Sequence, residues 1–450
     1  MPVIRIVGAG PTGTLLAILL QRGGADRVEL YECRPDLRAT AAESGRSINL
    51  ALADRGIHAL KMAGVFDTLG SAMLPMRGRL IHHRNRDTSF QRYGQRPNEV
   101  IYSVSRHRLN LGLLEVAARQ PGIVLHFEHR FEAADFAAGT AQIRDLRRDE
   151  LLCVPMQPLL AADGAGSLLR REMNALSLIE AHETDLEHGY KELSIPADRL
   201  HRHRLACDAL HIWPRGNYML IALPNEDGSF TATLFLPKRG SVSFEALRDP
   251  PAIEQFFTRE FPDAREFMPD CIEEFQAHPV GFLGTVSASP WHCGGLAALI
   301  GDSAHAMVPF HGQGMNCCFE DCVEFAACIA RHPSWQAAFA EFGSIRKPNT
   351  DAIAAMALEN YLEMREQVAD PKFQLRQALS LELERRFPRR FIPRYAMVMF
   401  HHEIPYRTAQ QRGATQAAIL ADLTAGAVAS LAEVDFERAA EKISARLSPV

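Results

Sequence analysis

Three glycines near the start of the chain have the spacing of a nucleotide-binding turn. Gly8, Gly10 and Gly13 directly follow the β-branched run Val3–Val7 and open an apolar stretch of helical character. In such a turn, Gly8 permits a tight bend, Gly10 lets a pyrophosphate approach the backbone, and Gly13 allows close helix packing. Glu32, about twenty residues further on at the end of a second predicted strand, can accept a hydrogen bond from a ribose hydroxyl. This pattern predicts a dinucleotide site on a βαβ unit.

Two later turns are predicted to meet the same face. Asp163-Gly164 and Gly301-Asp302 each follow a short apolar strand, and Pro309–Asn316 then leads into the helical run Cys317–Ala330. The start of a helix offers unpaired N–H groups and a partial positive charge, which stabilise negative charge on a reduced isoalloxazine ring. Glycines there also leave room for a flat ring.

Histidines and cysteines add no separate chemistry. His305 and His311 have no positioned nucleophile or carboxylate beside them in sequence, so we assign neither a proton-transfer role. Cys317, Cys318 and Cys322 fall at helical spacing, and we interpret them as small buried core residues rather than metal ligands. No metal site is predicted.

The elements that must position these residues alternate in type along the chain. Leu210–Trp213, Tyr218–Leu223 and Phe230–Leu236 are separated by polar turns and read as an antiparallel meander. Helical patterns dominate from about Ser334 onward. We therefore expect a doubly wound α/β domain interrupted by an antiparallel sheet and followed by helices.

Composition excludes several classes of function. A chain of 450 residues with 47% hydrophobic residues predicts two or three globular domains. The net charge of -5 argues against a nucleic-acid partner, because such binding depends on clustered Lys and Arg. Nine cysteines without a Cys-x-x-Cys motif fit a reducing compartment. Without a signal peptide or an apolar run of roughly 18 residues, we expect a cytoplasmic protein with no membrane contact.

Taken together, these motifs resemble a known family. The glycine turn, Arg106–Leu109, Asp163-Gly164 and Gly301-Asp302 resemble the single-component FAD-dependent aromatic hydroxylases, and the resemblance covers nearly the whole chain. Longer strings are similar to the kynurenine 3-monooxygenases in their bacterial, soluble form: Gly45–Leu52, Met76–Arg79, Leu210–Pro214, Pro309–Asn316, Leu358–Tyr361 and Arg390–Tyr395.

The resemblance implies a set of ligand contacts. The expected FAD contacts are Gly8, Gly10, Thr12, Gly13, Glu32, Arg34, Ala51, Arg106, Asp163, Asp302, Gly314, Met315 and Asn316. The expected substrate contacts are Arg79, Tyr93, Phe235, Phe310, His311, Asn360, Glu363 and Tyr395. No catalytic acid or base is among them.

Local pattern supports part of the substrate set. Arg79–Ile81 and Phe90–Tyr93 can pair as a hairpin, so that a guanidinium and a phenol face one ligand carboxylate. Asn360 and Glu363 lie three residues apart on one face of a helix predicted over Thr350–Val368. Phe235 and Phe310 are predicted to line the aromatic ring of the substrate.

The resemblance also implies the reaction and the domain plan. L-kynurenine would be hydroxylated to 3-hydroxy-L-kynurenine with NADPH and O2 through a C4a-hydroperoxyflavin, in tryptophan degradation and NAD biosynthesis, by a monomer or homodimer. Two alternatives stay open: a flavin hydroxylase of another aromatic acid, and a flavin-fold binding protein without turnover. The expected domains are a glutathione-reductase-like FAD domain (1–75, 100–180, 290–333), a substrate sheet domain (76–99, 181–289) and a helical region (334–450).

Overall fold

The computed structural model describes residues 3–39, 49–367 and 370–450. The chain divides into two compact units. The first comprises Met1–Met73, Val104–Leu186 and Gly284–Ala354, and the second comprises Leu74–Ser103, Glu187–Leu283 and Ala355–Val450. This division reflects packing, so the assignment of segments to FAD or substrate stays a prediction.

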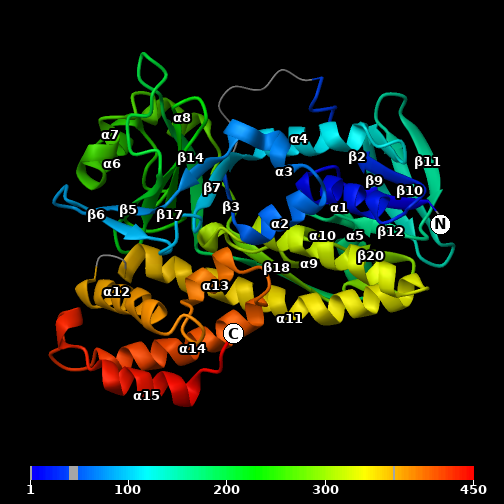
Figure 1. Ribbon diagram of the computed structural model, residues 1–450. Coiled ribbons are helices and arrows are strands. Elements are labelled where there is room, and N and C mark those ends of the chain that lie inside the picture. The colour runs from blue at the N-terminus through cyan, green and yellow to red at the C-terminus, as the bar shows by residue number, and fades with distance from the viewer. Residues whose placement is uncertain (1–2, 40–48, 368–369) are drawn as a thin grey trace. The chain divides into compact units, whose positions relative to one another are not determined.

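The first unit is built on a mostly parallel sheet (Figure 1), in which only β19 runs antiparallel to its neighbour. The strand order is β19 (His292–Cys293), β20 (Ala297–Leu299), β12 (Leu159–Ala161), β1 (Ile4–Val7), β2 (Val28–Glu32) and β8 (Ile123–Phe127). Parallel strands bring their carboxyl ends to one edge of a sheet. Gly8, Glu32, Asp163 and Asp302 follow or end four of these strands, so the predicted common face is confirmed.

Three helices of the first unit pack together beside this sheet. They are α1 (Pro11–Arg22), α4 (Arg106–Ala118) and α10 (Gly314–Arg331), and α2 (Asp54–Met62) also packs on α10. Helix α1 begins with Pro11, whose missing N–H is not needed at the first helical position. Its residues 13–20 are all buried, which anchors the glycine turn to the interior.

Smaller elements complete the first unit. A three-stranded sheet, β9 (His129–Asp135), β10 (Thr140–Asp145) and β11 (Glu150–Pro155), packs through β9 on α5 (Leu168–Ala175). A two-stranded ribbon joins β13 (Glu180–Asp185) to β18 (Gly284–Ser289).

The second unit contains a six-stranded sheet. Its order is β14 (His188–Ile195), β17 (Phe230–Pro237), β16 (Met219–Pro224), β15 (Ala209–Pro214), β5 (Gly78–His82) and β6 (Thr88–Arg92). The predicted meander is confirmed as β15, β16 and β17. The predicted hairpin is confirmed as β5 and β6, with Arg79 opposite Gln91. Parallel pairing of β5 with β15 joins the hairpin to the meander, with Arg79 opposite Leu210.

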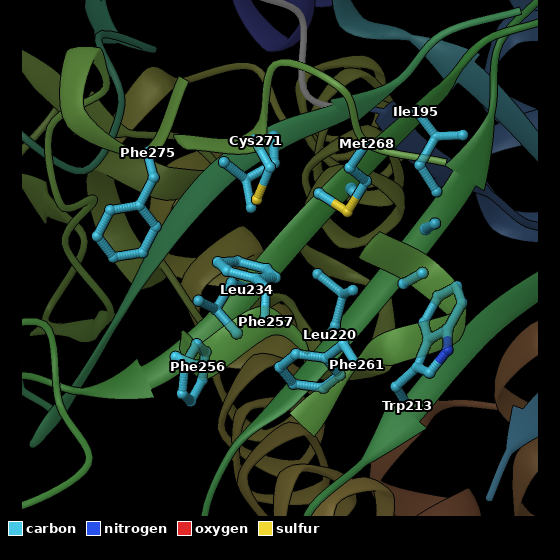
Figure 2. Packing of buried hydrophobic residues seen from close by; sticks show 14 of the residues in the cluster. Ile195, Trp213, Leu220, Leu234, Phe256, Phe257, Phe261, Met268, Cys271 and Phe275 are labelled. Carbon is cyan, nitrogen blue, oxygen red and sulfur yellow. The ribbon is translucent and has the colours of Figure 1, made fainter. Parts of the chain in front are cut away.

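One face of this sheet carries the main apolar core of the second unit. Trp213, Leu220 and Leu234 alternate inward and pack on α6 (Pro250–Glu260), α7 (Pro262–Arg265) and α8 (Cys271–Ala277), as Figure 2 shows. Because side chains alternate along a strand, Arg79 and Phe235 point to the opposite face. The core therefore packs on one face of the sheet, and Arg79 and Phe235 lie on the other face.

The helix that carries Asn360 differs from the prediction. Helix α11 spans Trp335–Leu362 and begins fifteen residues before the expected Thr350. Pro348 lies inside it, although proline usually marks a helix boundary. A π-helical segment, η3 (Glu363–Gln367), follows, so Glu363 is outside the regular helix. The predicted end, Val368, lies outside the described residues.

Four helices follow in the second unit: α12 (Pro371–Arg386), α13 (Arg394–Phe400), α14 (Tyr406–Leu423) and α15 (Phe436–Arg446). α12, α14 and α15 share a small apolar core around Leu379, Leu383, Ile419 and Ile443. Within the described ranges, no helix combines the length and apolar character that crossing a bilayer requires.

Candidate active site

The glycine turn leaves space where a pyrophosphate would lie. Gly8 has φ +98, a conformation that side chains rarely adopt, and a Cβ on Gly13 would lie 2.0 Å from the carbonyl oxygen of Gly8. A Cβ on Gly10 would meet no atom within 4 Å. Gly8 and Gly13 are therefore required by the fold, whereas Gly10 keeps open a space that the protein itself does not fill. This geometry fits a bound dinucleotide.

Glu32 and Arg34 form a charged pair beside this turn. The Glu32 Oε2 atom accepts from the backbone N–H of Ala9 at 3.0 Å, and Oε1 accepts from Arg34 Nε at 2.8 Å. Burial favours the neutral acid, but the hydrogen bond and charge of Arg34 keep the pKa of Glu32 below its ordinary value. Glu32 is therefore held as a carboxylate at the end of β2, where it can accept from a ribose.

Asp163 and Asp302 lie at the ends of two neighbouring strands. Asp163 Oδ2 accepts from the backbone N–H of Leu168 at 3.1 Å, while its Oδ1 is buried with no hydrogen-bond partner. Burial raises the pKa of Asp163. Asp302 begins the short helix α9 (Asp302–His305), and its Oδ1 accepts from the Cys318 thiol at 3.4 Å. An unsatisfied carboxylate oxygen at this edge is consistent with a missing ligand donor.

The side chain of Asn316, one of the expected FAD contacts, hydrogen-bonds to the backbone of two other segments. Its Nδ2 donates to the carbonyl oxygens of Ala51 and Gly312, each at 2.8 Å, and its Oδ1 accepts from Ala53 N at 2.9 Å. The amide thus joins the end of β3 (Asn49–Leu52) to the turn before α10. Both N–H groups of the amide are therefore used within the protein.

The other expected cofactor contacts occupy helix ends or turns of the first unit. Gly314 and Met315 begin α10, and Arg106 begins α4. Thr12 lies in the first turn of α1, where its carbonyl oxygen accepts from the Cys322 thiol at 3.4 Å. Of the motif Gly45–Leu52, only Asn49–Leu52 falls within the described residues.

His305 lies in a buried charged network of the first unit. Its Nε2 contacts Asp321 Oδ2 at 2.5 Å, and Arg346 Nε donates to Asp321 Oδ1 at 2.7 Å. Arg346 also pairs with Glu320 at 2.7 Å. These contacts indicate a structural role for His305. The thiols of Cys317, Cys318 and Cys322 are buried, which raises the pKa of each well above its ordinary value.

Arg79 is the centre of a polar cluster in the second unit. Its side chain is 8% exposed, and its Nη1 lies 3.4 Å from Glu363 Oε1. Its guanidinium carbon lies 4.9 Å from the ring centre of Tyr395 and 5.8 Å from that of Tyr93. Burial opposes its charge, but the neighbouring phenols and Glu363 raise the pKa of Arg79 above its ordinary value, so it stays a cation.

Two phenols and an amide complete this cluster, named here the Arg79 cluster: Arg79, Tyr93, Asn360, Glu363 and Tyr395. The rings of Tyr93 and Tyr395 stack with their centres 5.4 Å apart, and burial raises the pKa of both hydroxyls. Asn360 is buried, and its Nδ2 donates to the sulfur of Met364 at 3.4 Å. Five of the residues expected to bind substrate therefore come from three separate segments of one unit.

Phe235 belongs to the same sheet as Arg79, whereas Phe310 and His311 belong to the first unit. Phe235 is buried on the same sheet face as Arg79, but β15 and β16 separate their strands by about 14 Å at the usual strand spacing. If Phe235 contacts the same ligand as Arg79, it contacts a part of that ligand that lies away from Arg79. Phe310 and His311 are buried in the short helix η2 (Pro309–His311) of the first unit.

Arg170 and Ser303, which were not predicted as site residues, hydrogen-bond to the backbone of the turns at Asp163 and Asp302. Arg170 is buried and donates to the carbonyl oxygens of Ser303 (2.9 Å) and Ala165, so it joins the Asp163 and Asp302 turns. The Ser303 hydroxyl donates to Ala161 O at 2.7 Å and accepts from Ile300 N at 3.0 Å. No local motif marks Arg170, because its partners are non-local carbonyl groups.

This fold and glycine turn define a class of FAD-binding protein. Residues 1–338 match the family described as FAD binding domain. Solved structures with the same fold include a tetrameric 2-methyl-3-hydroxypyridine-5-carboxylic acid oxygenase, with 22% identity and a TM-score of 0.64 over 85% of this chain and 97% of that one. Another is the tetracycline destructase Tet(55), with 17% identity and a TM-score of 0.58 over 81% and 89% of the two chains.

Relatives with higher sequence identity define a more specific family. The kynurenine 3-monooxygenase of Stenotrophomonas maltophilia (strain K279a) is 48% identical over 444 residues, covering 99% of this chain and 97% of that protein. The kynurenine 3-monooxygenase of Myxococcus xanthus (strain DK1622) is 43% identical over 446 residues, covering 99% and 96%. The chain belongs to the kynurenine 3-monooxygenase family.

Proposed function

We propose that this protein hydroxylates L-kynurenine to 3-hydroxy-L-kynurenine, consuming NADPH and O2 and releasing NADP and water. The observation that carries the proposal is the pair of buried Arg79 and partly buried Glu363, whose charged atoms lie 3.4 Å apart beside two phenols. A guanidinium can bind an α-carboxylate, and a carboxylate can bind an α-ammonium group. A cation and an anion side by side match the zwitterionic end of an amino acid.

The same pair argues against a simple aromatic acid as substrate. A benzoate-like ligand brings only negative charge, so Glu363 would repel it and would compete with it for Arg79. Membership of the kynurenine 3-monooxygenase family supports the amino-acid substrate further.

FAD fits the first unit on the geometry of its turns. Gly10 would face the pyrophosphate, Glu32 would accept from the ribose, and the N–H groups of Gly314 and Met315 would face the ring. The orphaned Asp163 Oδ1 would gain a donor. When bound, the flavin supplies the electron transfer from NADPH and the activation of O2.

The protein's own contribution is to bind and orient. Arg79 and Glu363 would fix the amino-acid end, Tyr93, Tyr395 and Asn360 would add hydrogen bonds, and Phe235, Phe310 and His311 would line the ring. No side chain is required as nucleophile, acid or base. Thr12, Gly13, Arg34, Ala51, Arg106, Asp302 and Asn316 complete the proposed FAD site.

A panel of aromatic acids tests the proposal. NADPH oxidation by the purified, FAD-loaded protein should be stimulated by L-kynurenine and far less by 4-hydroxybenzoate or salicylate. Equal stimulation by the benzoates would favour the second candidate, a flavin hydroxylase of another aromatic acid. A colourless protein without NADPH oxidation would indicate a flavin-fold binding protein instead. We further propose a cytoplasmic location and a monomeric or homodimeric state.

A further inference from the structure

The π-helical segment η3 places one member of the Arg79 cluster. It follows α11 directly and begins with Glu363, while Asn360 lies in the last turn of α11. A π-helical turn is wider than an α-helical turn and is often found where a helix presents functional residues. The position of the Glu363 carboxylate relative to Arg79 therefore depends on what holds η3 in place.

Contacts to the β15–β16 turn hold η3. Gly216 N donates to the carbonyl oxygen of Arg365 at 3.0 Å, and Arg365 Nη1 donates to Asn217 Oδ1 at 3.1 Å. The Arg365 guanidinium also lies 5.0 Å from the ring centre of Tyr361. One backbone bond and one side-chain bond thus attach this segment to a single turn.

That turn belongs to the sheet that carries Arg79. It links β15 to β16 and is closed by Arg215 N donating to Tyr218 O at 3.0 Å. β15 pairs in parallel with β5, with Leu210 opposite Arg79. The contacts of Arg365 therefore fix the backbone that bears Glu363 to the sheet that bears Arg79, although the two segments are far apart in sequence.

His188 also contacts the turn between β15 and β16. Its Nε2 donates to the carbonyl oxygen of Asn217 at 2.9 Å, and a carbonyl can only accept, so this nitrogen carries the proton. Burial, with a smaller effect of Arg365, lowers the pKa of His188, which keeps the ring neutral. Asn217 is thereby held at its backbone by His188 and at its side chain by Arg365.

We propose that Arg365 and Asn217 are positioning residues that set Glu363 against Arg79 and so determine the affinity of the site for the zwitterionic end of the substrate. The inference rests on the proposed function. Neither residue is assigned a contact with substrate. In the proposed function Glu363 binds the ammonium group of the substrate, which is not the part of the substrate that reacts. Loss of the staple, defined as the Arg365–Asn217 hydrogen bond, is therefore expected to weaken binding more than turnover at saturation.

The test compares Arg365→Met and Asn217→Ala with wild type as FAD-loaded, full-length proteins. Calorimetric titration gives the Kd for L-kynurenine, and steady-state assays give KM and kcat. Both variants should raise Kd and KM by about 5-fold to 50-fold, with kcat changed by less than about 2-fold. Arg239→Met, at an exposed arginine of the same unit, is the matched control and should change none of these values.

A double-mutant cycle separates positioning from a general structural role. In a Glu363→Gln background, Arg365→Met should raise Kd by less than about 2-fold, because its effect passes through the Glu363 carboxylate. If the two effects multiply, or if kcat falls while Kd is unchanged, the proposal is wrong. Asn217→Ala provides the same test should Arg365→Met fail to fold, since the Gly216–Arg365 backbone bond does not depend on the Asn217 side chain.

Failure of the inference and failure of the proposed function have different signatures. Wild-type protein that neither binds nor hydroxylates L-kynurenine contradicts the proposed function. Wild-type protein that does both, with staple variants that bind equally well, contradicts the inference alone.

Discussion

Arg79 illustrates how a single buried charge can specify a ligand. It is a cation with one carboxylate neighbour at 3.4 Å, and its guanidinium carbon lies 4.9 Å and 5.8 Å from the ring centres of Tyr395 and Tyr93. Its Nε is buried without a hydrogen-bond partner. A ligand carboxylate would complete this coordination, as the hairpin pattern in the sequence already suggested.

Removing that charge should weaken substrate binding selectively. Arg79→Ala is expected to raise the KM for L-kynurenine by about 10-fold to 150-fold, because a charged hydrogen-bonding partner is lost. The FAD content, measured by flavin absorbance, should stay as in wild type. Arg92→Ala, at an exposed arginine of the same hairpin, serves as control. An unchanged KM in Arg79→Ala would remove Arg79 from the site.

Gly10 allows the cofactor site to be tested without damaging the fold. Its φ is -71 and ψ is 179, which valine can adopt, and a Cβ there meets no protein atom within 4 Å. Gly10→Val should therefore fold normally but lose most bound FAD, since its branched side chain fills the space proposed for the pyrophosphate. The flavin-to-protein ratio and the Tm of the apoprotein measure the two effects. Full FAD occupancy in this variant would show that the cofactor binds elsewhere, and Gly343→Val is a control in open space.

At the scale of elements, strand β15 contributes a buried histidine that should make stability depend on pH. His211 is fully buried, its Nε2 donates to Ala206 O at 2.9 Å, and its Nδ1 accepts from His82 at 2.9 Å. His82 in turn contacts Asp263 at 3.1 Å. Burial lowers the pKa of His211 to about 4.

The sign of that dependence follows from proton uptake. An unfolded histidine binds a proton below a pH of about 6.5, whereas folded His211 does not until about pH 4, so acid favours the unfolded state. The free energy of unfolding should fall by up to about 1.4 kcal/mol per pH unit across this window. Urea unfolding of His211→Gln between pH 7 and pH 4 should show a correspondingly shallower slope than wild type. Parallel slopes would mean that His211 titrates normally in the folded protein.

Helix α10 is anchored by the network of Asp321, Glu320 and Arg346. Arg346 pairs with both carboxylates in a largely buried setting, so its loss leaves Glu320 with Arg55 and Asp321 with His305 as the remaining partners. Arg346→Met should cost about 3 to 5 kcal/mol, which corresponds to a Tm lower by roughly 6 to 20 °C. Arg331→Met removes a half-exposed arginine on the same helix that pairs with Glu341. Its Tm should stay close to wild type, and a similar fall in both variants would contradict the assigned role of the network.

Some of these elements can be predicted from the sequence, and others cannot. The glycine turn and the β5–β6 hairpin were predictable because each depends on residues within one short segment. The predicted start of this helix, Thr350, is fifteen residues later than the observed start of α11. Pro348 indicates a helix boundary in the sequence, but it lies inside α11. The hydrogen bonds of the Asn316 amide to Ala51 and Ala53 could not be predicted, because these partners lie more than 260 residues away along the chain. The Arg365–Asn217 bond spans 148 residues and leaves no local pattern.

At the scale of the molecule, we propose that the two units carry out different tasks. The first unit carries the glycine turn and the strand-end carboxylates that fit FAD, and the second carries the Arg79 cluster that fits an amino acid. A 2-methyl-3-hydroxypyridine-5-carboxylic acid oxygenase and a tetracycline destructase share the fold at 22% and 17% identity, so the architecture alone does not determine the substrate. The substrate is therefore inferred from the side chains of the second unit.

The central claim is that these groups together direct one oxygen atom from O2 onto the ring of L-kynurenine. The most direct measurement is to incubate the purified protein with L-kynurenine and NADPH under oxygen gas enriched in the heavy isotope, and to identify the product by mass spectrometry. The account predicts 3-hydroxy-L-kynurenine carrying one labelled oxygen atom, formed in step with NADPH consumption. Unlabelled product, or NADPH consumption that yields only hydrogen peroxide while L-kynurenine stays intact, would contradict it.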